Sequence, residues 1–317
     1  MPMKMVITQP YLILKGGAER VILKIAQHYD AKIYVIEYDK KKTFPEFKDV
    51  DIEVIGKKIP FSHLLPYRAS QGMRAGYTFY NLKIKEDYDI LNSHTSPSEW
   101  IRNNNAPLLW YCHTPMREVY DLYEMRMKNR KKKEKLLYVA FTNSYKFLSR
   151  SIIKKIETIA TNSNNTNERI KKYFGRDDAV VINPAIEHKE FTNEGDGKYF
   201  LYPSRYYLNK RQDYVIEAFA KFMKKTGRKD YKLILPGSIS EDKEHLEYFE
   251  RLKKKNVPNV VFKLNITDSE LKSLYSRATA VMNAAVNEDF GIVTIEGIAA
   301  SKPLLAVNEV GFRETLV

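Results

Sequence analysis

Short apolar runs rich in β-branched residues alternate with amphipathic helical segments along nearly the whole chain. Strands that alternate with helices indicate parallel sheets covered by helices, which is an α/β architecture. A chain of 317 residues is too long for one ordinary compact core and fits two domains. The strands expected in the first part of the chain are residues 5–8, 32–37, 52–55, 89–93, 108–113, 158–162 and 179–183.

The alternation pauses at NPAIEHKEFTNEGDGK, residues 183–198, whose Pro, Gly, Asn and acidic residues are typical of a linker. A second series of strands and helices follows it. We therefore expect one Rossmann-like, doubly wound domain over residues 1–188 and another over 189–317. Ligands of such domains bind beyond the carboxyl ends of the strands. The second series has strands at 199–203, 231–235, 260–264, 280–283 and 304–307, and helices at 210–225, 241–255, 268–277 and 290–300.

The chain is basic, with 53 Lys and Arg against 39 Asp and Glu and a net charge of +14. Such an excess suits nucleotides, nucleic acid or an anionic membrane face, although a solvated lysine-rich surface gives the same balance. We expect no nucleic-acid partner, because no nucleic-acid-binding module accompanies the charge. The single cysteine, Cys112, fits a reducing compartment. The first residues make a poor signal peptide, and we expect a cytoplasmic protein.

One long helical region is expected over residues 116–156. It contains the basic run KNRKKKEK, residues 128–135, followed by the apolar LLYVAF, residues 136–141. A charge run is usually a solvated helix face, but a basic run beside apolar residues also suits anionic lipid headgroups. Residues 126–150 are therefore a candidate peripheral contact with the inner face of a membrane.

The segment KGGAERV, residues 15–21, follows the first expected strand and opens a helix. Gly16 and Gly17 let the backbone approach a ligand, and a helix start offers N–H groups to a phosphate. The segment lacks the ending of a Walker loop and is a weak signal on its own, since a plain turn explains it more simply.

The segment PSRYYLNKRQDYVIEAF, residues 203–219, places Arg205, Lys210 and Arg211 where a strand hands over to a helix. Cations there suit a diphosphate, which arginine binds in a forked geometry. The alternative is exposed charge at a helix start, which the helix dipole disfavours. His94 and His113 each stand at the carboxyl end of an expected strand, which is the ligand edge of the sheet. Cys112 and His113 point to opposite faces of their strand, so they are not a nucleophile pair.

A metal site is not expected. The triplet Asp87-Tyr88-Asp89 has the DxD form of a divalent-cation site, but it precedes its strand instead of following it. The sequence contains no HExxH or paired CxxC spacing.

The stretch NEDFGIVTIEGIAASKPLLA contains two acids, Glu288 and Glu296, in an otherwise apolar run. Glu288 is expected in the loop above a helix start, and Glu296 well inside that helix. Carboxylates are good acceptors for sugar and ribose hydroxyls, so both are candidates to face a ligand. The alternative is a first-turn acid favoured by the helix dipole plus one exposed helical glutamate.

This stretch resembles the E-x7-E signature of retaining glycosyltransferases of family 4, which have the GT-B fold. GGAERV, PSRYYLNKRQDYVIEAF and INPAIE match that family's pattern in the same order, and the resemblance covers essentially the whole chain. YCHTPMREVYDLYE is similar, more loosely, to the WbaZ-like mannosyltransferases. The resemblance implies two domains facing across a cleft, an acceptor-side one first and a donor-binding one second.

The resemblance also implies a role for each site residue, and no metal cofactor. Glu296 would hold the ribose of a nucleotide-sugar, and Glu288 the transferred sugar, together with backbone N–H groups of Asp289, Phe290 and Gly291. Arg205 and Lys210 would neutralise the diphosphate as it leaves. Gly16 and Gly17 would close over that diphosphate, His113 would lie near the sugar and acceptor, and the base would rest on Lys263, Leu264 and Asn265.

Two features depart from the family pattern. Asp289 stands where a glycine is usual and adds a charge near the sugar. The chain stops at Val317, where members usually continue, so the C-terminal domain is expected to be incomplete at its end, and interdomain closure and activity are correspondingly in question.

The function implied is transfer of a hexose, mannose from GDP-mannose above all, onto a glycan or lipid-linked acceptor. A UDP-sugar donor in the same fold is one alternative. A non-catalytic protein that only binds a nucleotide-sugar is the other.

Overall fold

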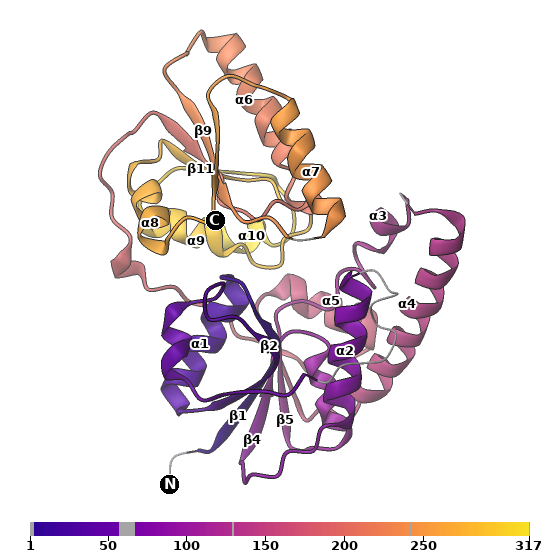
Figure 1. Cartoon of the computed structure of the whole chain (residues 1–317). Coiled ribbons are helices and arrows are strands. Elements are labelled where there is room, and N and C mark those ends of the chain that lie inside the picture. Colours follow the sequence, from indigo (N-terminus) through magenta and orange to yellow (C-terminus); the bar gives the residue numbers. More distant parts are fainter. Residues whose placement is uncertain (1–2, 57–66, 129, 241, 317) are drawn as a thin grey trace. The chain divides into compact units, whose positions relative to one another are not determined.

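A computed structural model describes residues 3–56, 67–128, 130–240 and 242–316, with the backbone alone at 67–69. The chain divides into two compact units, Met1–Pro184 and Ala185–Val317, and each is described by itself (Figure 1). The expected boundary after residue 188 lies a few residues further along than this division. Both units are parallel sheets with helices on both faces, so the expected α/β class is confirmed.

The N-terminal unit holds a seven-stranded sheet in the order β3-β2-β1-β4-β5-β6-β7. Every neighbouring pair is parallel. The connections leaving β1 run to one side and those entering β4 to the other, so a topological switch point lies between these two strands. The strands are β1 (Met5–Leu12), β2 (Lys32–Tyr38), β3 (Ile52–Val54), β4 (Ile90–Ser93), β5 (Leu108–Cys112), β6 (Thr158–Thr161) and β7 (Val180–Val181).

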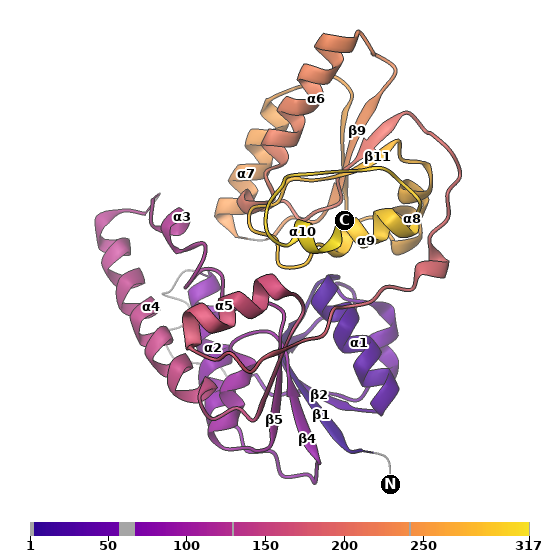
Figure 2. The same ribbon diagram turned by 180° about the vertical axis from the view of Figure 1, so that it is seen from behind.

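Helices cover this sheet unequally, with α1 on one face and α2, α4 and α5 on the other (Figures 1 and 2). The amphipathic α1 buries Ile22, Leu23 and Ala26 against the β1–β2 side, as its helical spacing predicts. The helices are α1 (Gly17–Tyr29), α2 (Tyr67–Asn81), α3 (Tyr123–Lys128), α4 (Lys132–Ile153) and α5 (Asn164–Phe174), with 3-10 turns η1 (Pro45–Asp49) and η3 (Ser98–Asn103).

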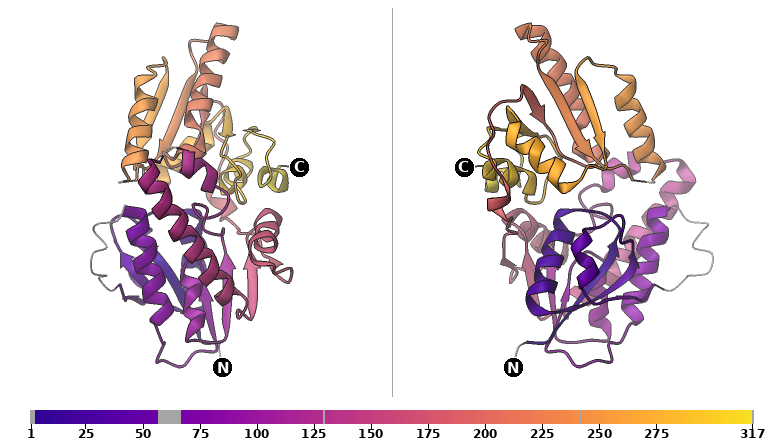
Figure 3. Two further views of the ribbon diagram at one scale, coloured as in Figure 1. Left: turned by 90° about the vertical axis from the view of Figure 1, so that its right-hand side faces the viewer. Right: turned by 60° about the vertical axis from the view of Figure 1, so that its left-hand side comes forward.

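The helices α2 and α4 run side by side, and Trp100 of η3 lies against both (Figure 3). A Cβ atom on Gly76 of α2 would meet the Trp100 ring at 2.7 Å, so glycine permits this close approach. On the other side, the Trp100 indole N–H donates to Ser149 Oγ of α4 at 3.1 Å. Trp100 therefore sets the spacing of the two helices.

The C-terminal unit holds a five-stranded parallel sheet in the order β10-β9-β8-β11-β12. Its switch point lies between β8 and β11, by the same reasoning as before. The strands are β8 (Tyr199–Leu201), β9 (Lys232–Gly237), β10 (Val260–Leu264), β11 (Ala280–Asn283) and β12 (Leu304–Ala306).

Two apolar clusters fill the faces of this second sheet. One lies under α6 and α7 and the other under α8 and α9. Local signals fix the helix starts: Asp242 accepts from the Glu244 N–H, and Thr267 forms a capping box with Glu270. The helices are α6 (Gln212–Thr226), α7 (Lys243–Lys254), α8 (Asp268–Arg277), α9 (Ile292–Ala299) and α10 (Phe312–Thr315), with turns η4 (His188–Glu190) and η5 (Leu208–Lys210).

The long helical region expected over residues 116–156 contains two helices and is not one continuous helix. The helix α3 ends at Lys128 and α4 begins at Lys132. Glu134 explains the new start, because its carboxylate accepts from the Lys131 backbone N–H at 3.1 Å, as at a helix beginning. Residue 129, within both the basic run and the candidate membrane segment, lies outside the described residues, as does residue 241 of an expected helix.

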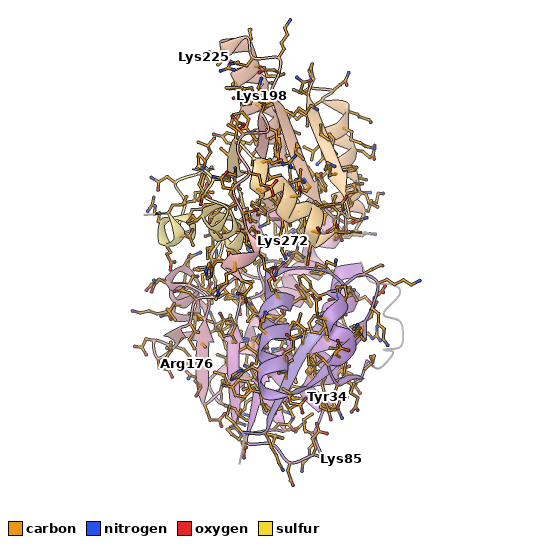
Figure 4. All side chains as sticks on the ribbon, turned by 90° about the vertical axis from the view of Figure 1, so that its left-hand side faces the viewer. Tyr34, Lys85, Arg176, Lys198, Lys225 and Lys272 are labelled. Carbon is orange, nitrogen blue, oxygen red and sulfur yellow. The ribbon has the colours of Figure 1, made fainter. Side chains whose placement is uncertain are left out.

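The basic charge is distributed over separate elements. Figure 4 labels Lys85, Lys198, Lys225 and Lys272, which come from distant parts of the chain. Some lysines are paired, as Lys272 is with Glu190 at 2.6 Å. These positions fit the reading of much of the charge as a solvated surface.

Candidate functional site

Gly16 and Gly17 lie at the start of α1, just beyond the carboxyl end of β1. Gly16 is the N-cap residue, with an extended backbone at φ −149°. A Cβ atom there would meet the carboxylate of Glu19 at 2.5 Å, and Glu19 is itself buried in the first turn of α1. Packing of Glu19 therefore explains Gly16 without a ligand, and the phosphate contact stays a prediction.

Three polar side chains are joined at the switch point of the N-terminal unit. Nδ1 of His94 lies 3.0 Å from Nε2 of His113, and Nε2 of His94 lies 2.8 Å from Oδ1 of Asn92. His94 is fully buried, and His113 is partly exposed. Burial lowers the pKa of His113 to about 3, and burial together with His113 holds the pKa of His94 well below its usual value. Both imidazoles are therefore neutral at pH 7.

An ion pair occupies the switch point of the C-terminal unit. Nζ of Lys210, at the end of η5, donates to Oε2 of Glu288 at 2.6 Å. The two side chains are 20% and 17% exposed, so both are mostly buried but still reach solvent. Lys210 follows β8 and Glu288 follows β11, the two strands between which the connections reverse. The structure thus brings together two residues that the sequence predicted separately.

Several bonds fix the loop that carries Glu288. Glu309 accepts from the Asn287 backbone N–H at 3.0 Å and from the Arg211 guanidinium at 2.8 Å. A Cβ atom on Gly311 would meet the carbonyl oxygen of Glu288 at 2.1 Å, so glycine allows the two segments to touch. Gly291 then turns the chain into α9 at φ +85°, a left-handed conformation that favours glycine. Phe290 is buried beside it, whereas Asp289 stays partly exposed.

Glu296 lies inside α9 and is buried, with 7% of its surface exposed. Its Oε2 accepts a hydrogen bond of 2.7 Å from the hydroxyl of Tyr275, which is fully buried at the end of α8. The expectation of an exposed helical glutamate is thereby excluded. A carboxylate has room for further hydrogen bonds, so this one remains an acceptor of fixed orientation.

Arg205 lies in the connection between β8 and α6, which also carries Lys210. Its guanidinium carbon is 5.0 Å from the centre of the Tyr207 ring, and that ring stacks on His245 at 4.2 Å. Within the described part of the chain, the ion pairs do not include Arg205. Its guanidinium can therefore face an anion from outside.

Lys263 and Leu264 end β10, two strands away from β8, and Asn265 directly follows them. The Asn265 N–H donates to the carbonyl of Gly237 at 3.0 Å. A Cβ atom on Gly237 would in turn meet the carbonyl oxygen of Ser204 at 2.0 Å. This chain of contacts leads from Asn265 to the residue before Arg205 and so joins the two parts of the expected donor site.

Sequence patterns do not predict the roles of Tyr275 and Asn92, or the ion pair between Arg211 and Glu309. One signal points to Tyr275, which is the last aromatic side chain of a helix that leads into β11. The sequence predicts His94 at a strand end, but it does not predict the hydrogen bonds of His94 to Asn92 and His113. The DxD triplet lies at the opposite end of β4, where Asp89 accepts from the Lys4 backbone N–H at 2.7 Å. Among the described residues, His, Cys, Asp and Glu nowhere gather in a group that would hold a metal ion.

Two family models together match most of the chain. The model of glycosyltransferase family 4 matches residues 15–190, and that of glycosyl transferases group 1 matches residues 183–317. Two curated relatives are alpha-1,3/1,6-mannosyltransferases named ALG2. That of Kluyveromyces lactis is 27% identical over 95% of this chain and 69% of the relative, and that of Dictyostelium discoideum is 25% identical over 95% and 81%.

Solved structures share the fold. HepE of Anabaena, in complex with UDP-glucose, has a TM-score of 0.69 at 16% identity and covers 98% of this chain and 82% of its own. Sucrose-phosphate synthase of Thermosynechococcus elongatus has a TM-score of 0.73 at 14% identity, with coverages of 99% and 84%.

The two Rossmann-like units and these matches define a glycosyltransferase with the GT-B fold. The family model covers more than half of the chain, and the protein belongs to glycosyltransferase family 4. The expected family is thereby confirmed. None of the helices in the described residues has the length and apolar character needed to cross a membrane.

Proposed function

We propose that the protein transfers mannose from GDP-mannose to a lipid-linked glycan, with retention of configuration at the sugar carbon. The relatives named above are mannosyltransferases, and a further relative, from Candida glabrata, is named for transfer from GDP-mannose to a glycan on a diphosphate lipid. The observation that carries the proposal is the Lys210–Glu288 pair at the switch point of the C-terminal unit.

The pair suits the junction between a sugar and its diphosphate. A carboxylate accepts hydrogen bonds from sugar hydroxyls, and an ammonium neutralises phosphate oxygens. We therefore assign Glu288 to the transferred sugar, and Lys210 with Arg205 to the diphosphate. The backbone N–H groups of residues 289–291, at the start of α9, complete the sugar contacts in this proposal.

Glu296 and the end of β10 would hold the rest of the nucleotide. The carboxylate of Glu296, oriented by Tyr275, accepts from the ribose hydroxyls, and the base rests on Lys263, Leu264 and Asn265. In the N-terminal unit, we keep Gly16 and Gly17 as contacts of the diphosphate. His113 keeps its proposed place near the sugar and the acceptor.

In the proposed reaction the bond between the sugar carbon and the phosphate oxygen breaks, and the diphosphate leaves with the bonding electrons. The acceptor oxygen bonds to the same face of that carbon, and its proton passes to a leaving-phosphate oxygen. Lys210 and Arg205 stabilise the charge that develops on the diphosphate. We propose that these two cations replace a metal ion, and full activity in EDTA would support this.

A donor screen tests the assignment. GDP-mannose should raise the melting temperature of the protein more than UDP-glucose does at equal concentration, because a ligand that binds only the native state stabilises it. A larger shift with UDP-glucose would instead favour a UDP-sugar transferase. Binding of GDP-mannose without turnover on any lipid-linked acceptor would favour a protein that only binds nucleotide-sugars.

We further propose that α4 rests on the cytoplasmic face of an anionic membrane, where a lipid-linked acceptor is found. Leu136 and Phe147 of α4 are 73% and 79% exposed, and they lie eleven positions apart, about three helical turns, on one stripe. Leu137, beside them, is 70% exposed. Lys132, Lys133 and Lys135 precede this apolar stripe, which is the composition that suits lipid headgroups.

Sedimentation with vesicles tests the membrane contact. Binding to vesicles that contain anionic lipid should fall when Leu136 and Phe147 are both changed to Ser, and should fall with added salt. Leu246→Ser is the matched control, because Leu246 is also an exposed leucine on a helix, at 46%, but belongs to the C-terminal unit. Equal binding of the double variant and the wild type would remove the proposal.

A further inference from the structure

The hydrogen-bond chain Asn92–His94–His113 has a direction, and Asn92 sets it. The Nδ2 amide group of Asn92 donates to the carbonyl oxygen of Leu109 at 3.3 Å, and Oδ1 faces Nε2 of His94 at 2.8 Å. Turning the amide over would place its oxygen against the Leu109 carbonyl oxygen, which is another acceptor. Asn92 is buried, so no solvent would relieve that repulsion. Oδ1 therefore accepts, and Nε2 of His94 carries a proton.

The direction then passes to His113. A neutral imidazole has one N–H and one lone pair. Because Nε2 of His94 carries its proton, Nδ1 has the lone pair, and the 3.0 Å contact requires a proton on Nε2 of His113. The lowered pKa values of both rings, which keep them neutral, fit this assignment. His113 itself is then left with its lone pair on Nδ1.

That lone pair lies at the ligand edge of the sheet. His113 directly follows β5, whose neighbour β4 borders the switch point, and its side chain is partly exposed. Among the described residues, His94 is the hydrogen-bond partner of His113, through the other ring nitrogen. The ring of Tyr111, 4.9 Å away at 61°, restricts its rotation.

We propose that Asn92 and His94 are positioning residues that hold His113 in the Nε2–H tautomer, so that Nδ1 accepts a hydrogen bond from a substrate hydroxyl. The identity of the substrate as a sugar rests on the function proposed above, whereas the tautomer does not. A hydroxyl can donate to this nitrogen, but a deprotonated phosphate oxygen cannot. The tautomer therefore selects a sugar hydroxyl over a phosphate at this position.

Nitrogen NMR of histidine-labelled protein tests the tautomer directly. The chain has six histidines, and the signals missing from His113→Gln identify the ring. Wild-type protein should show His113 as the Nε2–H tautomer from pH 6 to 8. An Nδ1–H tautomer, or a protonated ring in that range, would overturn the proposal.

Two replacements of His94 separate positioning from packing. In His94→Asn the side-chain carbonyl stands near the former Nδ1 and can accept from His113, so the tautomer should persist. His94→Leu removes the acceptor for the Nε2 proton of His113, so His113 should become a mixture of tautomers. The kcat/KM of His94→Leu should then be at least about tenfold below that of His94→Asn. An unchanged tautomer in His94→Leu would exclude the positioning role.

Further variants keep the test decisive if His94→Leu does not fold. Asn92→Ala removes the acceptor for Nε2 of His94 and should also mix the tautomers of His113, and an unchanged tautomer would count against the proposal. His188→Gln, in η4 of the C-terminal unit, is the control that should leave the His113 signals in place. Since these spectra need no substrate, they test the tautomer of His113 independently of the proposed mannose transfer.

Discussion

Nζ of Lys210 lies 2.6 Å from Oε2 of Glu288, although 78 positions separate them in the chain. Each follows one of the two strands that flank the switch point of the C-terminal unit, so the topology of the sheet brings them together. The pair places a cation and a hydrogen-bond acceptor side by side, which is what a sugar diphosphate needs at its junction.

Lys210→Ala should lower kcat by about 100-fold or more, because a preorganised charge on the leaving group is lost. The melting temperature should change little, since both side chains reach solvent. Steady-state kinetics with GDP-mannose measure the effect. Lys243→Ala is the control, because Lys243 is 89% exposed and pairs only loosely with Glu247, and it should keep full activity. A kcat equal to that of the wild type would remove Lys210 from the reaction.

Tyr275→Phe should weaken donor binding about fivefold while kcat stays within about twofold, because one hydrogen bond of about 1 kcal/mol is lost. Tyr275 holds Oε2 of Glu296 at 2.7 Å and does not itself approach the leaving group in this account. Titration calorimetry with GDP-mannose measures the dissociation constant. Glu296→Ala should weaken binding further, and an unchanged constant in Glu296→Ala would refute the ribose assignment.

Gly311→Ala should reduce kcat/KM by at least about tenfold, while the C-terminal unit stays folded. The backbone of Gly311 is ordinary, with φ −65°, so the added methyl group acts by displacing the Glu288 carbonyl that it would approach to 2.1 Å. Gly72→Ala, in α2, is the control. The added Cβ atom would meet only the side chain of Met116, at 4.0 Å, so this substitution should be neutral or stabilising. Equal loss of activity in the two variants would count against this reading.

Glu99→Gln should stabilise the N-terminal unit at pH 8 by more than about 1 kcal/mol and much less at pH 4. Glu99 is buried, and burial raises the pKa of its carboxyl from 4.5 to about 8, near the phenols of Tyr120 and Tyr145. The folded protein thus keeps the proton that the unfolded chain loses above pH 4.5, so stability falls as pH rises from 4.5 to 8.

Urea unfolding followed by tryptophan fluorescence measures this effect, because Trp100 and Trp110, the two tryptophans of the chain, both lie in the N-terminal unit. The variant should lose the decline that the wild type shows between pH 4.5 and pH 8. Glu247→Gln, an exposed glutamate of the C-terminal unit at 56%, should leave the decline unchanged. A wild-type stability that does not fall over this range would contradict the burial argument.

The α/β class and most strands followed from the sequence because hydrophobic periodicity and composition are local properties of the chain. The break between α3 and α4 did not, because the basic run has neither proline nor glycine, and the signal was the single acid Glu134. That residue acts through a hydrogen bond to a backbone N–H, which composition does not reveal.

The site residues were predictable in type but not in their contacts. Glu288 and Glu296 stand out as acids in an apolar run, and Lys210 stands out as a cation at a helix start, where the helix dipole opposes it. Their partners lie far away in the chain: Tyr275 reaches Glu296 from the preceding helix, and Lys210 and Glu288 are 78 positions apart. Such pairings depend on which strands become neighbours, and a single sequence does not contain that information in any local pattern.

Transfer of labelled mannose from GDP-mannose to a lipid-linked glycan tests the central claim most directly. The wild-type protein should give a labelled lipid-soluble product, and Lys210→Ala should reduce its rate of formation by about 100-fold. Labelling from a UDP-sugar but not from GDP-mannose, or an equal rate with Lys210→Ala, would contradict the account.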